Sequence, residues 1–171
     1  MKPGAYTQLY IQLVFAVKNR EALLHSSIRN RVFEYLSGAI TEMGHKSIIV
    51  NGVANHVHIL LGLNPAVSIS DTVHDLKRSS SLFINREKLC SFSFAGQEGY
   101  GAFSYSRSKM DLVYQYILNQ EEHHKKSSFK NEYIGFLRKF EIDYNDKFLF
   151  DFMEDVEPLR DIWIDAVFYN T

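Results

Sequence analysis

Two histidines separated by one residue are the first side chains of this sequence that could do chemistry. His56-Val57-His58 stands in an apolar segment whose pattern predicts a strand over residues 55–63. In a strand, side chains at i and i+2 emerge on the same face, roughly 7 Å apart at the backbone, so both imidazoles could bind one metal ion. Val57 would then point into the core. Histidine pairs also occur without a metal, and a further ligand is needed to decide.

A tyrosine and a glutamine one helical turn apart form the second candidate pair. Tyr116 and Gln120 lie in a predicted helix over residues 108–124, where positions i and i+4 share a face. The Gln120 amide oxygen could bind a hard cation, and a tyrosine beside that cation could attack phosphorus once the cation favours the phenolate. The alternative for this pair is an ordinary amphipathic helix with a core-edge tyrosine and a solvated glutamine.

The neighbours of this pair are weaker candidates. Tyr114 lies two residues before Tyr116 and so faces away from it. His123 and His124 are adjacent, and adjacent helix positions diverge by roughly 100°, so one metal ion is not expected to take both. We therefore expect these two histidines to contact the substrate or to lie on the surface.

The elements that must position these residues alternate in type along the chain. Hydrophobic patterns predict strands over 7–17, 46–50 and 55–63, a fourth strand within 92–106, and helices over 28–43, 68–88, 108–124 and 129–140. The order β-α-β-β-α-β-α is typical of an α+β protein with a ferredoxin- or RRM-like antiparallel sheet and helices on one face.

Composition and charge narrow the class of protein. The 171 residues are 46% hydrophobic and 23% charged, as in one soluble domain, and no apolar run approaches the roughly 18 residues of a membrane span. We expect a cytoplasmic location and no membrane partner. Cys90 is the only cysteine, which excludes an internal disulfide.

Residues 141–171 contain nine acidic and two basic residues, whereas residues 1–140 contain 17 basic and eleven acidic ones. A basic body suits a polyanion, although a solvated surface could show the same asymmetry.

Three motifs together resemble the single-tyrosine HUH transposases, which include the IS200-like insertion-sequence transposases and their REP-associated relatives. The motifs are His56-Val57-His58, Gly99-Tyr100-Gly101-Ala102-Phe103-Ser104 and Tyr116-Ile117-Leu118-Asn119-Gln120-Glu121-Glu122-His123-His124. They stand in the family's order and approximate spacing, between about Tyr6 and Tyr144. The joint match is specific, whereas none of its parts would be.

The resemblance implies a fold, a reaction and a set of site residues. It implies the HUH endonuclease fold, with Tyr116 as the nucleophile that forms a 5′-phosphotyrosine and with His56, His58 and Gln120 as ligands of Mg²⁺ or Mn²⁺. It further implies a homodimer that cleaves and rejoins single-stranded DNA at hairpin-bearing element ends without a nucleotide cofactor. Two imidazoles by themselves would favour zinc, nickel or copper, so Mn²⁺ is the easiest compromise.

The resemblance also suggests how the chain is divided. Residues 1–144 are assigned to a single HUH transposase domain, and residues 145–171 to an acidic, aromatic-containing C-terminal extension that packs on the body or on a partner subunit. Basic residues near the motifs are candidate DNA contacts, although each could equally belong to a solvated helix face: Lys77, Arg78, Arg107, Lys109, Lys125 and Lys126.

Two departures from the family's pattern keep other functions open. Asn55 stands where many members have an aspartate, and Gly96-Gln97 stands where many have an aromatic residue before the glutamine. They leave open a catalytically impaired or domesticated hairpin-DNA-binding protein. An RRM-like RNA-binding domain is less favoured, because base stacking needs exposed aromatic side chains where the strand over 55–63 offers His56 and His58.

Overall fold

A four-stranded antiparallel sheet forms the centre of the protein in a computed structural model that describes residues 4–18, 24–91 and 93–152. The elements are β1 (Tyr10–Ala16), α1 (Ser26–Glu42), β2 (Lys46–Gly52), β3 (His56–Gly62), α2 (Ile69–Arg86), β4 (Gly101–Tyr105), α3 (Met110–Leu118), α4 (Gln120–His124) and α5 (Phe129–Lys139), with 3₁₀ turns at Arg107–Lys109 and Asp146–Phe148. The strand order is β2-β3-β1-β4, and every neighbouring pair is antiparallel. The predicted α+β class and antiparallel sheet are therefore confirmed. In the described part of the chain, no helix combines the length and the apolarity that crossing a membrane requires.

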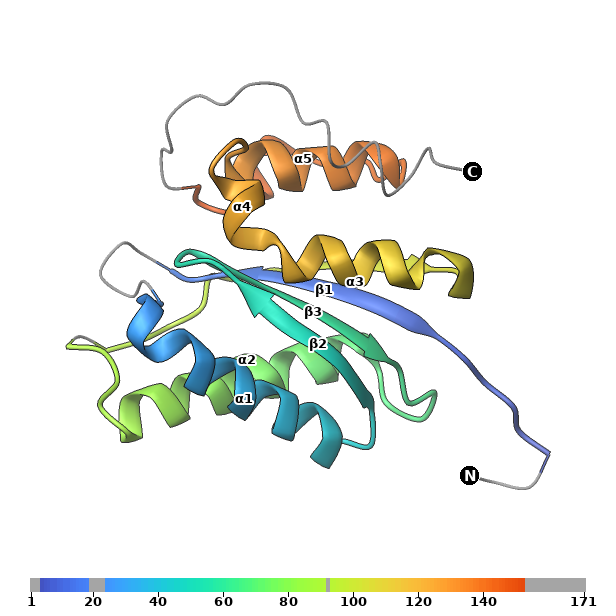
Figure 1. Cartoon of the computed structure of the whole chain (residues 1–171), viewed down its shortest axis with the longest axis horizontal. Coiled ribbons are helices and arrows are strands. Elements are labelled where there is room, and N and C mark those ends of the chain that lie inside the picture. Colours follow the sequence, from blue (N-terminus) through green and yellow to red (C-terminus); the bar gives the residue numbers. More distant parts are fainter. Residues whose placement is uncertain (1–3, 19–23, 92, 153–171) are drawn as a thin grey trace.

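Helices cover both faces of the sheet, whereas the sequence pattern predicted helices on one face. α1 and α2 lie against one face, and α3, α4 and α5 lie on the other side (Figure 1). The second layer follows from the apolar faces of α3 and α5, which bury Val113, Ile117 and Phe136 against the sheet. β1 is consequently buried along its whole length.

Strand β3 divides its side chains between the two sides of the sheet. Val57, Ile59 and Leu61 join the core that contains α1 and α2. His58 instead contacts the rings of Tyr116 and Phe136, from α3 and α5. The alternation predicted for this strand is confirmed, and it places both histidines between the sheet and the second helical layer.

A tight connection joins β2 to β3 just before the histidines. A Cβ atom on Gly52 would lie 2.3 Å from the backbone oxygen of His56, so only glycine permits this approach. Asn51 and Gly52 are the last two residues of β2. The Asn51 side chain can therefore reach the carboxyl end of α3.

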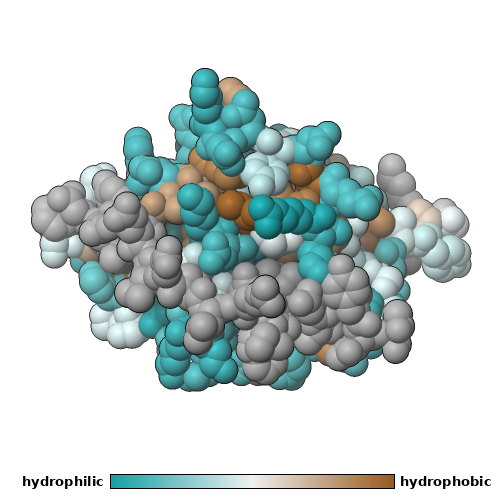
Figure 2. All heavy atoms as spheres, turned by 90° about the horizontal axis from the view of Figure 1, so that it is seen from above, coloured by the Kyte–Doolittle hydropathy of each residue, from teal (hydrophilic) through white to brown (hydrophobic). Residues whose placement is uncertain are grey.

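The described start of the C-terminal extension packs on the body. Phe150 is buried against the rings of Phe129 and Tyr133. Gln97 accepts a hydrogen bond from the Asp151 backbone N–H at 2.7 Å and donates one to the Asp151 carbonyl at 2.9 Å. Figure 2 views this side of the molecule and shows hydrophilic side chains over most of the described surface, with smaller apolar areas between them. Residues 153–171 of the predicted extension lie outside the described residues.

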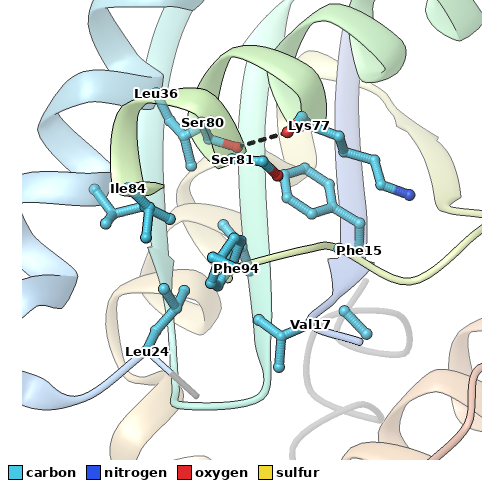
Figure 3. A pocket seen from close by; sticks show the side chains of 13 residues that line it. Phe15, Val17, Leu24, Leu36, Lys77, Ser80, Ser81, Ile84 and Phe94 are labelled. Carbon is cyan, nitrogen blue, oxygen red and sulfur yellow. Dashed lines mark hydrogen bonds between the residues drawn. The ribbon is translucent and has the colours of Figure 1, made fainter. Parts of the chain in front are cut away.

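The core between the sheet and α1–α2 contains a small cavity of about 20 Å³. Phe15, Leu36, Ile84 and Phe94 contribute apolar walls, and the Ser80 hydroxyl beside them donates to a backbone oxygen of α2 (Figure 3). A space of this size holds about one water molecule at most. This side of the sheet is therefore a packed core, and the groups that could do chemistry lie on the other side.

Leu76 tests how much of the stability rests on this core. We expect Leu76→Ala to lower the free energy of unfolding by about 3 kcal/mol, because Leu76 is fully buried and truncation leaves a cavity. Leu82→Ala, on the same helix but 59% exposed, should cost under about 0.5 kcal/mol. Urea denaturation followed by circular dichroism measures both, and equal losses would contradict the described orientation of α2.

Candidate active site

β3 holds His56 and His58 in fully buried positions, with ring centroids 5.0 Å apart. His56 stacks on Phe129 at a centroid distance of 3.9 Å, and its Nδ1 lies 2.7 Å from Asn55 Oδ1. Because an amide oxygen only accepts, Nδ1 carries the ring proton and Nε2 keeps a lone pair. Burial lowers the pKa of His56 to about 3, so the ring is neutral near pH 7. Asn55, although it carries no negative charge, thus orients this histidine through a hydrogen bond.

The helix that carries Tyr116, α3, ends where a side chain from β2 donates hydrogen bonds to its last carbonyl oxygens. Asn51 Nδ2 donates to the backbone oxygens of Ile117 and Leu118 at 2.8 and 3.0 Å. Those oxygens would otherwise accept from the next helical turn. The chain turns at Asn119 (φ −97°, ψ 25°), and α4 begins at Gln120. The prediction of one continuous helix over residues 108–124 is therefore wrong, since α3 and α4 are separate.

A carboxylate from α5 lies at the centre of the site. Glu132 is fully buried, and its Oε1 accepts hydrogen bonds from the Tyr116 hydroxyl and from Gln120 Nε2, the latter at 3.0 Å. Three imidazole nitrogens lie 3.2–3.3 Å from its carboxylate oxygens, namely Nε2 of His56, His58 and His124. The pair predicted from β3 and the pair predicted from the tyrosine helix therefore meet on one acidic side chain.

The burial of this cluster shifts its proton equilibria. Burial alone would raise the pKa of Glu132, but its interactions with the neighbouring imidazoles of His58 and His124 outweigh burial and hold that pKa well below its usual range. Burial, followed by the charge of Glu132, raises the pKa of Tyr116 well above 10. In this state the carboxyl group is ionised and the phenol is protonated.

The donor set fits a divalent metal ion. One ligand atom from each of His56, His58, His124 and Glu132 lies within 4.8 Å of all the others. Within the described part of the chain, two buried acceptors here have no hydrogen bond of acceptable geometry, His56 Nε2 and Gln120 Oε1. His56 Nε2 also faces a Glu132 oxygen at 3.2 Å, so a lone pair confronts a carboxylate. A cation between them would satisfy these acceptors, and imidazole and carboxylate are ordinary ligands of such ions.

The structure brings the four predicted residues together and adds two that the sequence analysis missed. His56, His58, Tyr116 and Gln120 all contact Glu132 within one chain. His124 also contacts Glu132, and His123 is 5% exposed, so the alternative that these two histidines lie on the surface is wrong. The four-residue spacing of Tyr116, Gln120 and His124 was a usable signal for His124. Nothing in the sequence distinguishes Glu132 from the other acidic residues.

The remaining predicted residues lie around this cluster or on α2. Tyr114 is 37% exposed, on the outer side of α3. Lys77 donates to the backbone oxygens of Gln97 and Gly99, the latter at 2.9 Å, and burial lowers its pKa, so its ammonium group holds that loop. Arg78 is exposed beside it, along a surface depression of about 500 Å³.

The other basic candidates flank α3 and α4. Arg107 lies 3.8 Å from Asp111, and Lys109 is half-buried at the start of α3. Lys125 pairs with Glu122 at 2.5 Å, a contact that raises the pKa of the lysine, and Lys126 is exposed. Lys125 and Lys126 directly follow His124 in the chain.

Comparisons with known proteins identify the class to which this fold and site belong. A solved structure described as a transposase candidate from Deinococcus radiodurans R1 is 23% identical, with a TM-score of 0.55, and the match covers 70% of this chain and 96% of that one. A REP-associated tyrosine transposase bound to a REP hairpin is 12% identical, with a TM-score of 0.54, and the match covers 95% and 98%. Both share the fold. A search of curated proteins found no match.

The fold and the motifs define a DNA transposase. The family model described as "Transposase IS200 like" matches residues 5–120, which is more than half of the chain. The chain therefore belongs to the IS200-like transposase family, whose members act in DNA transposition.

The buried neutral His56 predicts a pH dependence of stability. The unfolded chain takes up a proton on this ring as the pH falls through 6.5, whereas the folded chain does so only near 3, so stability is full above pH 6.5 and is lost as the pH falls. In EDTA, we expect the free energy of unfolding of the wild type to fall between pH 7 and pH 5 by about 2 kcal/mol more than that of His56→Gln. Urea denaturation at each pH provides the comparison, and parallel curves for the two proteins would refute it.

Proposed function

We propose that this transposase cleaves and rejoins single-stranded DNA through a covalent bond to Tyr116, with a divalent metal ion bound beside it. The observation that supports this function is the convergence of the Tyr116 hydroxyl and three imidazole nitrogens on the buried carboxylate of Glu132. We assign His56, His58 and Gln120 as metal ligands, as the family resemblance implies. The geometry leads us to add His124 and Glu132.

The reaction we propose exchanges one phosphate ester for another. Tyr116 Oη bonds to the scissile phosphorus while the bond from that phosphorus to the 3′ oxygen breaks, which leaves a 5′-phosphotyrosine and a free 3′-OH. The phenol loses one proton and the 3′ oxygen gains one. Rejoining reverses the exchange, so no nucleotide cofactor is consumed. A bound divalent ion would neutralise charge on the non-bridging phosphate oxygens and favour the phenolate.

The described state holds the nucleophile in a closed position. Tyr116 is 8% exposed, and its hydroxyl is donated to Glu132. α5 carries Glu132 and lies over α3 and the sheet (Figure 1). We therefore expect DNA to reach Tyr116 only when the α4–α5 layer moves away from the sheet.

The substrate we propose is a single-stranded DNA hairpin near the end of the mobile element. The structure of the REP-associated tyrosine transposase has a REP hairpin bound, which supports this choice. Exposed cations near the site are candidate phosphate contacts, in particular Arg107 and Lys126, with Arg78 on α2 beside the exposed ring of Tyr100.

The assembly, location and domain division are also proposals. The resemblance implies a homodimer, although the described side chains of the Glu132 cluster all come from one chain. A protein that acts on chromosomal DNA is expected in the cytoplasm. We retain residues 1–144 as the transposase domain and residues 145–171 as its extension.

Tyr116→Phe is the direct test of the nucleophile. Labelled single-stranded hairpins from the flanks of the encoding gene are incubated with Mn²⁺ and the protein, and a denaturing gel reports the covalent protein–DNA adduct. We expect an adduct with wild type and none with Tyr116→Phe or His58→Ala, because phenylalanine has no nucleophilic oxygen. Tyr114→Phe, on the same helix, is the matched control and should retain at least half of the adduct.

A DNA-binding protein without turnover is the second candidate function. The asparagine at position 55 favours it, because Asn55 supplies no negative charge beside His56. Under this alternative, wild type, Tyr116→Phe and His58→Ala would bind the hairpin equally well, and none would form an adduct.

The ligand set also predicts which metal ion binds. Three imidazoles and one carboxylate suit Mn²⁺ better than Mg²⁺, which prefers oxygen ligands. Isothermal titration calorimetry should give a Kd for Mn²⁺ at least tenfold lower than for Mg²⁺. His124→Ala should weaken Mn²⁺ binding by at least tenfold, whereas His74→Ala, an exposed histidine on α2, should leave it unchanged. Tighter binding of Mg²⁺ than of Mn²⁺ would overturn this assignment.

A further inference from the structure

A row of hydrogen-bonded polar side chains leads from the sheet to His58, and two of its members, Tyr105 and Gln12, have no part in the chemistry proposed above. Gln12, in the central strand β1, is fully buried. Its Oε1 accepts a hydrogen bond from the Tyr105 hydroxyl at 2.7 Å, and its Nε2 lies 2.8 Å from Nδ1 of His58. A buried amide in the middle of a strand is costly unless both of its ends are hydrogen-bonded, and here both are. These hydrogen bonds connect β4, β1 and β3, and the last side chain in the row, His58, contacts the Glu132 carboxylate.

The direction of these hydrogen bonds fixes the proton on His58. Gln12 Nε2 can only donate, so Nδ1 of His58 accepts, and a neutral ring then carries its proton on Nε2. That nitrogen lies 3.3 Å from both oxygens of Glu132, to which it donates. In this arrangement the proton occupies the position that a metal ion bound to Nε2 would need.

The other two histidines of the cluster have the opposite arrangement. Nδ1 of His56 faces Asn55 Oδ1 at 2.7 Å, and Nδ1 of His124 faces the Ser127 carbonyl at 2.8 Å. Both of these partners are oxygens that only accept, so each Nδ1 carries a proton. Nε2 of His56 can offer a lone pair to a cation, and Nε2 of His124, which lies 3.2 Å from Glu132 Oε2, can do so when the ring is neutral. Of the three imidazoles, His58 alone has a partner that can change between donor and acceptor.

An amide at position 12 can serve His58 in both protonation patterns. Turned by 180°, it would offer Oε1 to a proton on Nδ1 of His58 and Nε2 to the oxygen of Tyr105. The Nε2 lone pair of His58 would then be free for a metal ion. The Tyr105 hydroxyl, which donates to Oε1, favours the unturned amide.

We propose that Gln12 is a positioning residue whose amide orientation, held by Tyr105, selects the ring nitrogen of His58 that carries the proton. One orientation belongs to the state in which His58 donates to Glu132, and the other belongs to the metal-bound state. This inference rests on the proposed function, because it takes His58 as a metal ligand. It predicts opposite effects for the two neighbours: Gln12 supplies the acceptor that the metal-bound state needs, and Tyr105 holds that acceptor away.

The test compares wild type, Gln12→Leu and Tyr105→Phe in metal binding and in the ring ¹⁵N shifts of His58. Zn²⁺ serves as the probe because it is diamagnetic, and His58→Gln assigns the resonances. We expect Nδ1 of wild-type His58 to be an acceptor without metal and to carry the proton with Zn²⁺. Gln12→Leu should bind Zn²⁺ at least tenfold more weakly. Tyr105→Phe should bind it several-fold more tightly.

The outcomes separate this inference from the proposed function. Unchanged Zn²⁺ affinity in Gln12→Leu, or an unchanged or lower Zn²⁺ affinity in Tyr105→Phe, would overturn the role of Gln12 while leaving the metal site in place. A wild type that binds no metal would overturn the metal site itself. In that case the metal-free spectra still show whether Gln12→Leu removes the donor to Nδ1. If Gln12→Leu does not fold, the affinity of Tyr105→Phe decides.

Discussion

The carboxylate of Glu132 is the constraint on which the rest of the site depends. It is fully buried and ionised, and a buried charge costs several kcal/mol unless hydrogen bonds and opposite charges compensate it. The compensation comes from three elements: β3 supplies His56 and His58, α3 supplies Tyr116, and α4 supplies Gln120 and His124. Each of these elements must therefore lie where its polar group reaches α5. The same convergence produces a donor set that fits a divalent cation.

This convergence is possible because the sheet is covered on both faces. The side with α1 and α2 is packed with apolar side chains, including Leu76 and Ile59, and contains only a small cavity. The second layer is then able to hold polar groups between the sheet and α5, where burial excludes water and strengthens their interactions. The polar cluster thus lies on one face of the sheet, within the apolar packing of that face.

Much of the fold and of the site follows from local patterns in the sequence. The period of two along β3 places His56 and His58 on one face and Val57 on the other, because successive side chains of a strand alternate. The spacing of Tyr116 and Gln120 brings both residues to Glu132, although α3 ends between them. The order of strands and helices predicts the antiparallel sheet. These features depend on neighbours a few residues apart, which the sequence displays directly.

Only the tertiary structure determines how this site is completed and what its imidazoles contact. Glu132 is 74 residues from His58 and has no motif around it, so its role depends on how α5 packs over the sheet. The end of α3 depends on Asn51, 66 residues earlier, whose amide takes carbonyls that a longer helix would use. His124 reaches the cluster from α4, after that break. The sequence by itself determined the family, the strand that carries the histidines and the helix that carries the tyrosine. The carboxylate at the centre needed the tertiary structure, because contacts between distant residues leave no local pattern.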